Sequence, residues 1–85
     1  GKMKKLLYFS APWCQPCKTL GPIMDQVSTQ VTVKKINVDD SPEMASHYGI
    51  RSVPTVVLVT EYGDEKGRLV GVQSQQTYLD MYNQN

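Results

Sequence analysis

The stretch "APWCQPCK", residues 11–18, contains both cysteines of this 85-residue chain and its only tryptophan. Two residues separate the cysteines. Three kinds of site use such a spacing: a structural disulfide, half of a metal centre and a redox-active dithiol. The sequence on either side of this stretch distinguishes among them.

A strand and a helix are predicted around the cysteines. The apolar run 6–9 is typical of a buried strand. From Cys14 onward, apolar side chains recur at intervals of three and four residues, as they do on one face of a helix. The members of this stripe are Cys17, Leu20, Met24 and Val27. Pro16 suits the first turn, where its missing N–H has no helical partner, and Pro22 is expected to kink the helix.

The remainder of the chain predicts alternating elements. Strands are expected over 31–38, 56–59 and 68–70, with a hairpin loop over 61–67. A short helix has Asp40 or Ser41 at its start and Gly49 after its end. A last helix is capped by Ser74, and its Tyr78, Met81 and Tyr82 share one face. The order β-α-β-α-β-β-α predicts an α/β fold with a four-stranded mixed sheet and helices on both faces. We expect one domain over residues 1–85, with residues 1–2 as a remnant of processing or expression.

Composition excludes several classes of function. Nine basic and eight acidic residues leave a net charge of +1, without the basic stripe typical of nucleic-acid binding. The longest apolar run, Val56–Val59, is far shorter than the ~20 residues of a membrane span. The apolar run after Lys5 is also too short for a signal peptide, which favours the cytoplasm. We therefore expect no nucleic acid and no membrane as partners.

A metal centre or a purely structural disulfide explains the cysteines poorly. Two cysteines and one histidine, His47, are too few for a closed zinc site within one chain, so we expect no metal. A bridge across one helical turn restrains little that the helix does not already restrain. We assign no chemistry to His47, nor to the charged pairs 34–35 and 39–40, which are typical of solvated faces.

A redox-active pair explains why two residues separate Cys14 from Cys17. Residues i and i+3 of a helix share a face, within the ~4.4–6.8 Å Cα separation that a disulfide needs. At the helix start, Cys14 lies near unpaired N–H groups that favour its thiolate. Cys17 lies one turn deeper and is expected to be less accessible. Cys14 would attack a substrate disulfide and Cys17 would resolve the mixed disulfide.

The segments "FSAPWCQPCK" (9–18) and "KKINVDDSPEMASHYGIRSVPTVVLV" (34–59) resemble the thioredoxin family, and Gly71 matches a late glycine of that family. The similarity extends from Leu6 over most of the chain. It implies a minimal thioredoxin-like fold and a dithiol–disulfide oxidoreductase that reduces protein disulfides without a cofactor beyond its own Cys14–Cys17 disulfide. It further implies disulfide-containing protein substrates and a recycling reductase such as thioredoxin reductase. A monomer is expected only as the default state.

The resemblance also implies roles for residues outside the pair. Trp13 would be a partly exposed contact surface, although a core tryptophan is the simpler interpretation. Val53 and Pro54 would form a cis-proline turn that faces the cysteines and pairs with substrate backbone. Gly71 would allow substrate backbone to approach closely.

Several positions would modulate the reaction. Pro16 and Lys18 match thioredoxins, whereas Gln15 replaces the usual glycine and is expected to alter partner choice and potential. Relative to the family, the chain begins after the first strand and helix. Tyr8 replaces a buried aspartate, the lysine that neighbours this aspartate is retained as Lys35, and a family tryptophan is replaced by Ser10. Tyr8 is a poor base with an ordinary pKa of ~10, so water or the leaving thiolate would deprotonate Cys17, and Tyr8 would mainly fill the strand.

Other functions remain open at this point. The same fold could serve a glutaredoxin-like enzyme, or an oxidising or isomerising enzyme. It could also serve a redox-inactive binding module in which the cysteines are incidental.

Overall fold

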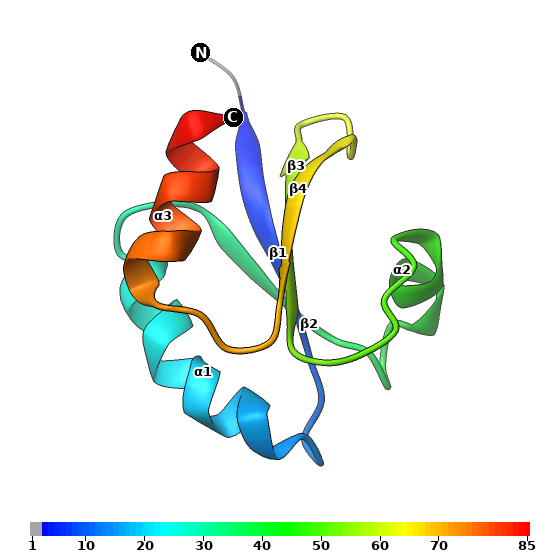
Figure 1. Cartoon of the computed structure of the whole chain (residues 1–85). Helices are drawn as coiled ribbons and strands as arrows, with labels where there is room; N and C mark the ends of the chain where they lie inside the picture. Colours follow the sequence, from blue (N-terminus) through cyan, green and yellow to red (C-terminus); the bar gives the residue numbers. More distant parts are fainter. Residues whose placement is uncertain (1–2) are drawn as a thin grey trace.

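The computed structural model of the chain describes residues 3–85, so the interpretation of residues 1–2 lies outside it (Figure 1). The elements are β1 (Lys4–Ser10), α1 (Gln15–Val27), β2 (Val33–Asn37), α2 (Pro42–His47), β3 (Thr55–Thr60), β4 (Glu65–Val70) and α3 (Gln75–Gln84). This is the predicted order of strands and helices.

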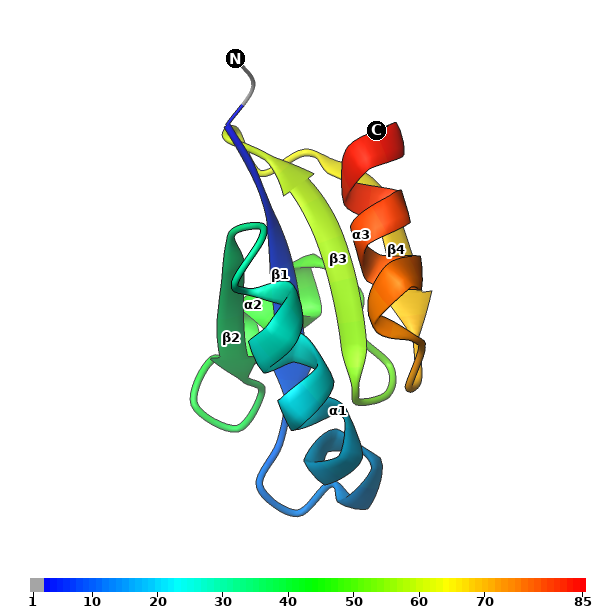
Figure 2. The same cartoon turned by 90° about the vertical axis from the view of Figure 1, so that its left-hand side faces the viewer.

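The sheet has four strands in the order β2-β1-β3-β4. The β1–β2 pair is parallel, and the β1–β3 and β3–β4 pairs are antiparallel. Two perpendicular views place α1 and α3 on one face of the sheet and α2 on the other (Figures 1 and 2). The predicted mixed sheet with helices on both faces is therefore confirmed.

Side chains alternate between the two faces of β1 because successive residues of a strand point in opposite directions. Leu6 and Tyr8 pack in the core beneath α1 and α3, whereas Leu7 and Phe9 pack in the core beneath α2. The buried residues of α1 are Cys17, Leu20, Met24 and Val27, the predicted stripe. This stripe fixes the helix against the sheet and thereby places the cysteines at the end of β1.

Several predicted strand boundaries are wrong, and hydrogen bonds explain two of them. The second strand begins at Val33 because the N–H of Val31 still bonds to the carbonyl of Val27, 3.1 Å away, as the chain leaves α1. The hairpin loop is shorter than 61–67, since β4 already begins at Glu65 and the Thr60 N–H bonds to the Asp64 carbonyl at 2.9 Å. Helix α1 continues through Pro22, and the kink expected at this proline stays a prediction.

Helix α2 ends as predicted at a glycine. Gly49 has a φ of 63°, and the Ile50 N–H bonds back to the Ala45 carbonyl at 2.8 Å. This pairing is typical of a helix C-terminus with glycine just beyond the cap. His47, the last helical residue, is exposed, and its ring lies edge-on to Tyr48. The turn sends the chain back toward the cysteines through residues 51–54.

Candidate active site

The cysteine pair lies where β1 ends and α1 begins. Cys14 and Cys17 are joined by a disulfide, with their Cα atoms 5.3 Å apart. This distance is within the range that the i, i+3 spacing predicted. Because α1 is packed against the sheet along its whole apolar stripe, both cysteines are held at the end of the sheet where β1 finishes.

Cys14 is the N-cap residue of α1. Its backbone is extended, with φ −87° and ψ 111°, and its Sγ accepts a hydrogen bond from the Cys17 N–H at 3.2 Å. Pro16 lies in the first turn and donates no N–H of its own. A helix N-terminus stabilises negative charge, so this position favours a thiolate at Cys14 once the disulfide is reduced.

Exposure does not distinguish the two cysteines in the disulfide-bonded state. Cys14 is 4% exposed and Cys17 is 6% exposed. The prediction that Cys17 is the less accessible residue is therefore wrong for this state, because both cysteines belong to one buried cluster with Ala11, against which Val38 and Val53 pack. Their difference lies in helix position: Cys14 caps the helix, and Cys17 belongs to its first turn.

The Val53–Pro54 turn faces the pair. The peptide bond between these residues is cis, and Pro54 is fully buried. The Val53 carbonyl oxygen lies 3.5 Å from the Sγ of Cys14. The predicted cis geometry and the predicted position opposite the cysteines are both confirmed, which leaves a backbone carbonyl directly beside the reactive sulfur.

Gly71 joins this arrangement from the end of β4. Its N–H donates to the Pro54 carbonyl at 2.9 Å, and its φ is 80°. A Cβ at Gly71 would meet no atom within 4 Å, so glycine is needed here for the backbone conformation and not for lack of space. The structure thus brings Cys14, Val53, Pro54 and Gly71 together, while their roles toward a substrate stay predictions.

Trp13 is a surface residue next to Cys14. Its side chain is 68% exposed, which rules out a core tryptophan. The indole N–H donates to Oδ2 of Asp39 at 3.0 Å. Asp39, for which the sequence predicts only a solvated face, is thus the acceptor of an indole hydrogen bond. No local pattern indicates this contact, which depends on β2 lying beside β1 so that the Val38 N–H reaches the Ser10 carbonyl at 2.9 Å.

Tyr8 lies beneath Cys17. Its hydroxyl donates to the Cys17 carbonyl oxygen at 3.2 Å, and Lys35 Nζ lies 6.0 Å from its ring centroid. Burial raises the pKa of Tyr8 above its ordinary value of 10.0, so the phenol is protonated near neutral pH. Tyr8 therefore fills the strand as expected, and its hydroxyl also donates a hydrogen bond to the backbone of Cys17 in the first turn of α1.

A pocket of about 370 Å³ opens beside Cys17. Its lining residues are Tyr8, Ser10, Ala11, Pro12, Cys17, Lys18, Gly21, Lys35 and Asn37. Gln15 and Pro16 are exposed on the surface next to the pair. The residues predicted to modulate the reaction thus surround the cysteines, and Cys17 forms part of the pocket wall.

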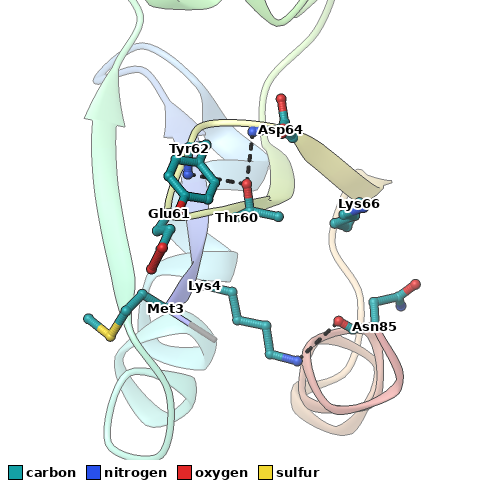
Figure 3. Close-up of a pocket in the computed structure, with 8 residues that line it drawn as sticks. All are labelled: Met3, Lys4, Thr60, Glu61, Tyr62, Asp64, Lys66 and Asn85. Carbon is teal, nitrogen blue, oxygen red and sulfur yellow. Dashed lines mark hydrogen bonds between the residues drawn. The ribbon is translucent and has the colours of Figure 1, made fainter. Parts of the chain in front are cut away.

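A second pocket, of about 480 Å³, has no contact with the cysteines. Its lining residues are Met3, Lys4, Thr60, Glu61, Tyr62, Asp64, Lys66 and Asn85 (Figure 3). Lys4, where β1 begins, donates from Nζ to the Asn85 carbonyl at 3.2 Å. Since Ser10, at the other end of β1, leads into the cysteine stretch, this pocket lies at the end of the sheet away from the cysteines.

Over residues 3–85, no three His, Cys, Asp or Glu side chains are grouped so that they could hold a metal ion. No helix in the same range has the length and apolar character needed to cross a membrane.

Comparisons with known proteins agree with the geometry. The thioredoxin family matches residues 1–84. A thioredoxin of Rickettsia felis is 42% identical over 84 residues, which cover 94% of this chain and 79% of the relative. A chloroplastic M-type thioredoxin of Zea mays is 42% identical over 76 residues, or 85% of this chain and 45% of the relative.

A solved structure extends this agreement to three dimensions. A mutant thioredoxin from Halobacterium salinarum NRC-1 superimposes with a TM-score of 0.87 at 36% identity, over 95% of this chain and 73% of that one. The chain belongs to the thioredoxin family and is a thiol–disulfide oxidoreductase with Cys14 and Cys17 as its redox-active pair.

Proposed function

We propose that this chain works in the reducing direction and transfers two electrons from its dithiol to disulfides of other proteins. The observation that carries the proposal is the position of Cys14, at a helix N-cap and 3.5 Å from the Val53 carbonyl, beside the exposed Trp13. The helix end favours a thiolate, and the neighbouring backbone and indole provide a surface for a polypeptide.

The first step is attack by the Cys14 thiolate on a substrate disulfide. The substrate S–S bond breaks, a new S–S bond joins Cys14 to one substrate sulfur, and the other substrate sulfur leaves as a thiolate that takes a proton from water. The Cys17 N–H, which donates to Cys14 Sγ at 3.2 Å in the disulfide, stabilises the attacking thiolate before this step.

The second step releases the product. Cys17 loses its proton to water in the adjoining pocket or to the departing thiolate, and its sulfur attacks Cys14. The Cys14–Cys17 bond forms while the mixed disulfide breaks, and the second substrate sulfur leaves as a thiolate. The protonated Tyr8 hydroxyl, which donates to the Cys17 carbonyl at 3.2 Å, holds the peptide of the resolving residue during this exchange.

Substrate backbone would dock along residues 53–54 and Gly71. Recognition of an extended segment by backbone hydrogen bonds tolerates many sequences, which suits an enzyme that acts on unrelated proteins. Trp13 would cover the segment next to the substrate cysteine. Gln15 and Lys18, both exposed at the rim, would adjust partner choice.

We place the activity in the cytoplasm, with the chain as a monomer and with a reductase such as thioredoxin reductase as its recycling partner. Each cycle leaves the Cys14–Cys17 disulfide oxidised, so turnover needs an external reductant. A compartment that keeps thiols reduced supplies one. No cofactor beyond the disulfide and no metal takes part in the steps proposed here.

The test is reduction of insulin disulfides with dithiothreitol as the electron source, by the intact chain and by Cys14→Ser and Cys17→Ser. We expect the intact chain to be active and Cys14→Ser to be inactive. Reduced Cys17→Ser, mixed with insulin after the dithiothreitol has been removed, should form a mixed disulfide that it does not release. Activity that survives Cys14→Ser would support a binding module with incidental cysteines.

The reduction potential of the pair separates the remaining alternatives. Equilibration against graded thiol–disulfide buffers should give about −270 mV, the value of reducing thioredoxins. About −200 to −230 mV would indicate glutaredoxin-like behaviour, and about −120 mV would indicate a disulfide donor and overturn the reducing direction.

A further inference from the structure

We propose that Tyr78, a residue of α3 far from the cysteines in sequence, is a positioning residue that holds the Gly71 segment in place for substrate docking. The inference rests on the proposed function, since it concerns the backbone on which a protein substrate would dock. It assigns to the hydroxyl of Tyr78 a role in binding protein substrates and none in the exchange at sulfur.

The hydroxyl of Tyr78 makes two hydrogen bonds to the segment that joins β4 to α3. It donates to the Gly71 carbonyl oxygen at 3.1 Å and accepts from the Gln73 N–H at 3.1 Å. The side chain is fully buried in the core beneath α1 and α3. A single phenol therefore ties both ends of the 71–73 turn to the buried core beneath α1 and α3.

This segment needs such support because no strand or helix provides it. Strand β4 ends at Val70, and Ser74 is the N-cap of α3. Between them, Gly71 has a φ of 80°, which no regular element provides. Burial raises the pKa of Tyr78, so its hydroxyl keeps the proton that it donates.

The support continues to the cysteines through backbone groups. Gly71 donates its N–H to the Pro54 carbonyl at 2.9 Å, and the carbonyl of the preceding residue, Val53, lies 3.5 Å from Cys14 Sγ. Tyr78 is thus the buried end of a connection that runs through Gly71 to the Val53–Pro54 turn. Loss of its hydroxyl would loosen Gly71 and leave the disulfide itself unaltered.

Helix α3 offers a matched control. Tyr82, one turn after Tyr78, donates its hydroxyl to the Lys4 carbonyl at 3.1 Å. Lys4 begins β1, at the end of the sheet away from the cysteines. Tyr82→Phe therefore removes a tyrosine hydroxyl from the same helix at a site without a connection to Gly71.

The experiment compares Tyr78→Phe and Tyr82→Phe with the unaltered chain on two substrates, insulin and the small disulfide 5,5′-dithiobis(2-nitrobenzoate). We expect Tyr78→Phe to raise the apparent KM for insulin about three- to tenfold, the span of the one neutral hydrogen bond that the hydroxyl makes to Gly71. The small disulfide does not pair with backbone at Gly71, so its rate should change less than twofold. Tyr82→Phe should change neither the apparent KM for insulin nor the rate with the small disulfide by more than twofold.

Three outcomes would overturn the inference. The first is a KM for insulin that is the same in Tyr78→Phe and Tyr82→Phe. The second is a loss of activity in Tyr78→Phe that is equally large on insulin and on the small disulfide. The third is a backbone amide of Gln73 that exchanges no faster in Tyr78→Phe than in the unaltered chain. An unaltered chain that fails to reduce insulin, or a Cys14→Ser variant that still reduces it, would instead overturn the proposed function.

The test remains decisive if Tyr78→Phe does not fold. In the unaltered chain, the Gln73 N–H that bonds to the Tyr78 hydroxyl should exchange with solvent more slowly than the N–H of the exposed neighbour Val72. Equal exchange at the two positions would show that the hydroxyl does not hold the segment and would overturn the inference.

Discussion

The hydroxyl of Tyr8 lies 3.2 Å from the carbonyl oxygen of Cys17 and so joins β1 to the first turn of α1. The bond links the centre of the sheet to the peptide of the resolving cysteine. Tyr8 is 3% exposed, so the bond is shielded from water. A position that the family resemblance associates with a buried acid is here a protonated donor that fixes the geometry of the helix start.

Removal of this hydroxyl should destabilise the protein. Tyr8→Phe keeps the ring and removes one buried hydrogen bond, so we expect the free energy of unfolding to fall by about 1 kcal/mol. Urea denaturation at neutral pH measures the change. Tyr62→Phe is the control, because the side chain of Tyr62 is 83% exposed. Loss of its hydroxyl should change the free energy of unfolding by less than about 0.5 kcal/mol. Equal stability of the two variants would contradict the expected role of the bond.

Asp39 should restrain Trp13 and thereby assist substrate binding. Asp39→Ala removes the acceptor of the indole N–H, so the exposed ring gains freedom that a bound substrate must remove again. Ordering one side chain costs about 0.5–1.5 kcal/mol, which corresponds to a two- to tenfold loss in the rate of insulin reduction. The fluorescence anisotropy of Trp13, the only tryptophan, should fall in parallel.

The neighbouring carboxylate provides the control for this prediction. Asp40→Ala removes the same charge one residue later, where no hydrogen bond reaches the indole, and should leave both the anisotropy and the rate close to those of the unaltered chain. If Asp40→Ala has the same effect as Asp39→Ala, the surface charge and not the indole contact is responsible.

Structural features that depend on residues close together in the sequence were predictable. The apolar stripe of α1 follows from intervals of three and four residues, and the end of α2 follows from Gly49. The cis bond before Pro54 was predictable only through the family resemblance, since a strand-entry proline is the simpler interpretation of the local sequence.

Contacts that depend on the packing of whole elements were not predictable. The bond from Tyr78 to Gly71 requires α3 to lie against the sheet at one particular height, and the bond from Trp13 to Asp39 requires β2 to pair with β1. Tyr78 appeared in the sequence only as one of three apolar side chains on a helix face. Periodicity indicates which face is buried, but it does not indicate what a hydroxyl on that face will meet.

Gly71 should be sensitive to substitution because of its backbone and not its surroundings. Gly71→Ala places a Cβ in open space but at a φ of 80°, which costs an L residue about 1–2 kcal/mol. Gly21→Ala is the matched control, since Gly21 lies within α1 and its Cβ also meets nothing. That change should stabilise the protein by about 0.5–1 kcal/mol. Denaturation curves in urea that shift in the same direction for both variants would contradict this account.

The buried phenols Tyr8 and Tyr78 should make the protein sensitive to alkali. Burial raises the pKa of both above the ordinary value of 10.0. Well below pH 10 both states keep these protons, so the two groups add no pH dependence there. Above pH 10 the unfolded chain releases protons that the folded chain retains, and stability falls with rising pH until the folded phenols also ionise.

Comparison with a variant isolates this effect from other groups that titrate in alkali. Each proton released only by the unfolded chain lowers the free energy of unfolding by about 1.4 kcal/mol per pH unit. Tyr78→Phe lacks one such proton, so its stability should start lower at pH 7 but decline less steeply between pH 10 and 11. Urea denaturation of both proteins across this range measures the two slopes. Parallel slopes would mean that Tyr78 ionises equally in the folded and unfolded states, which its complete burial argues against.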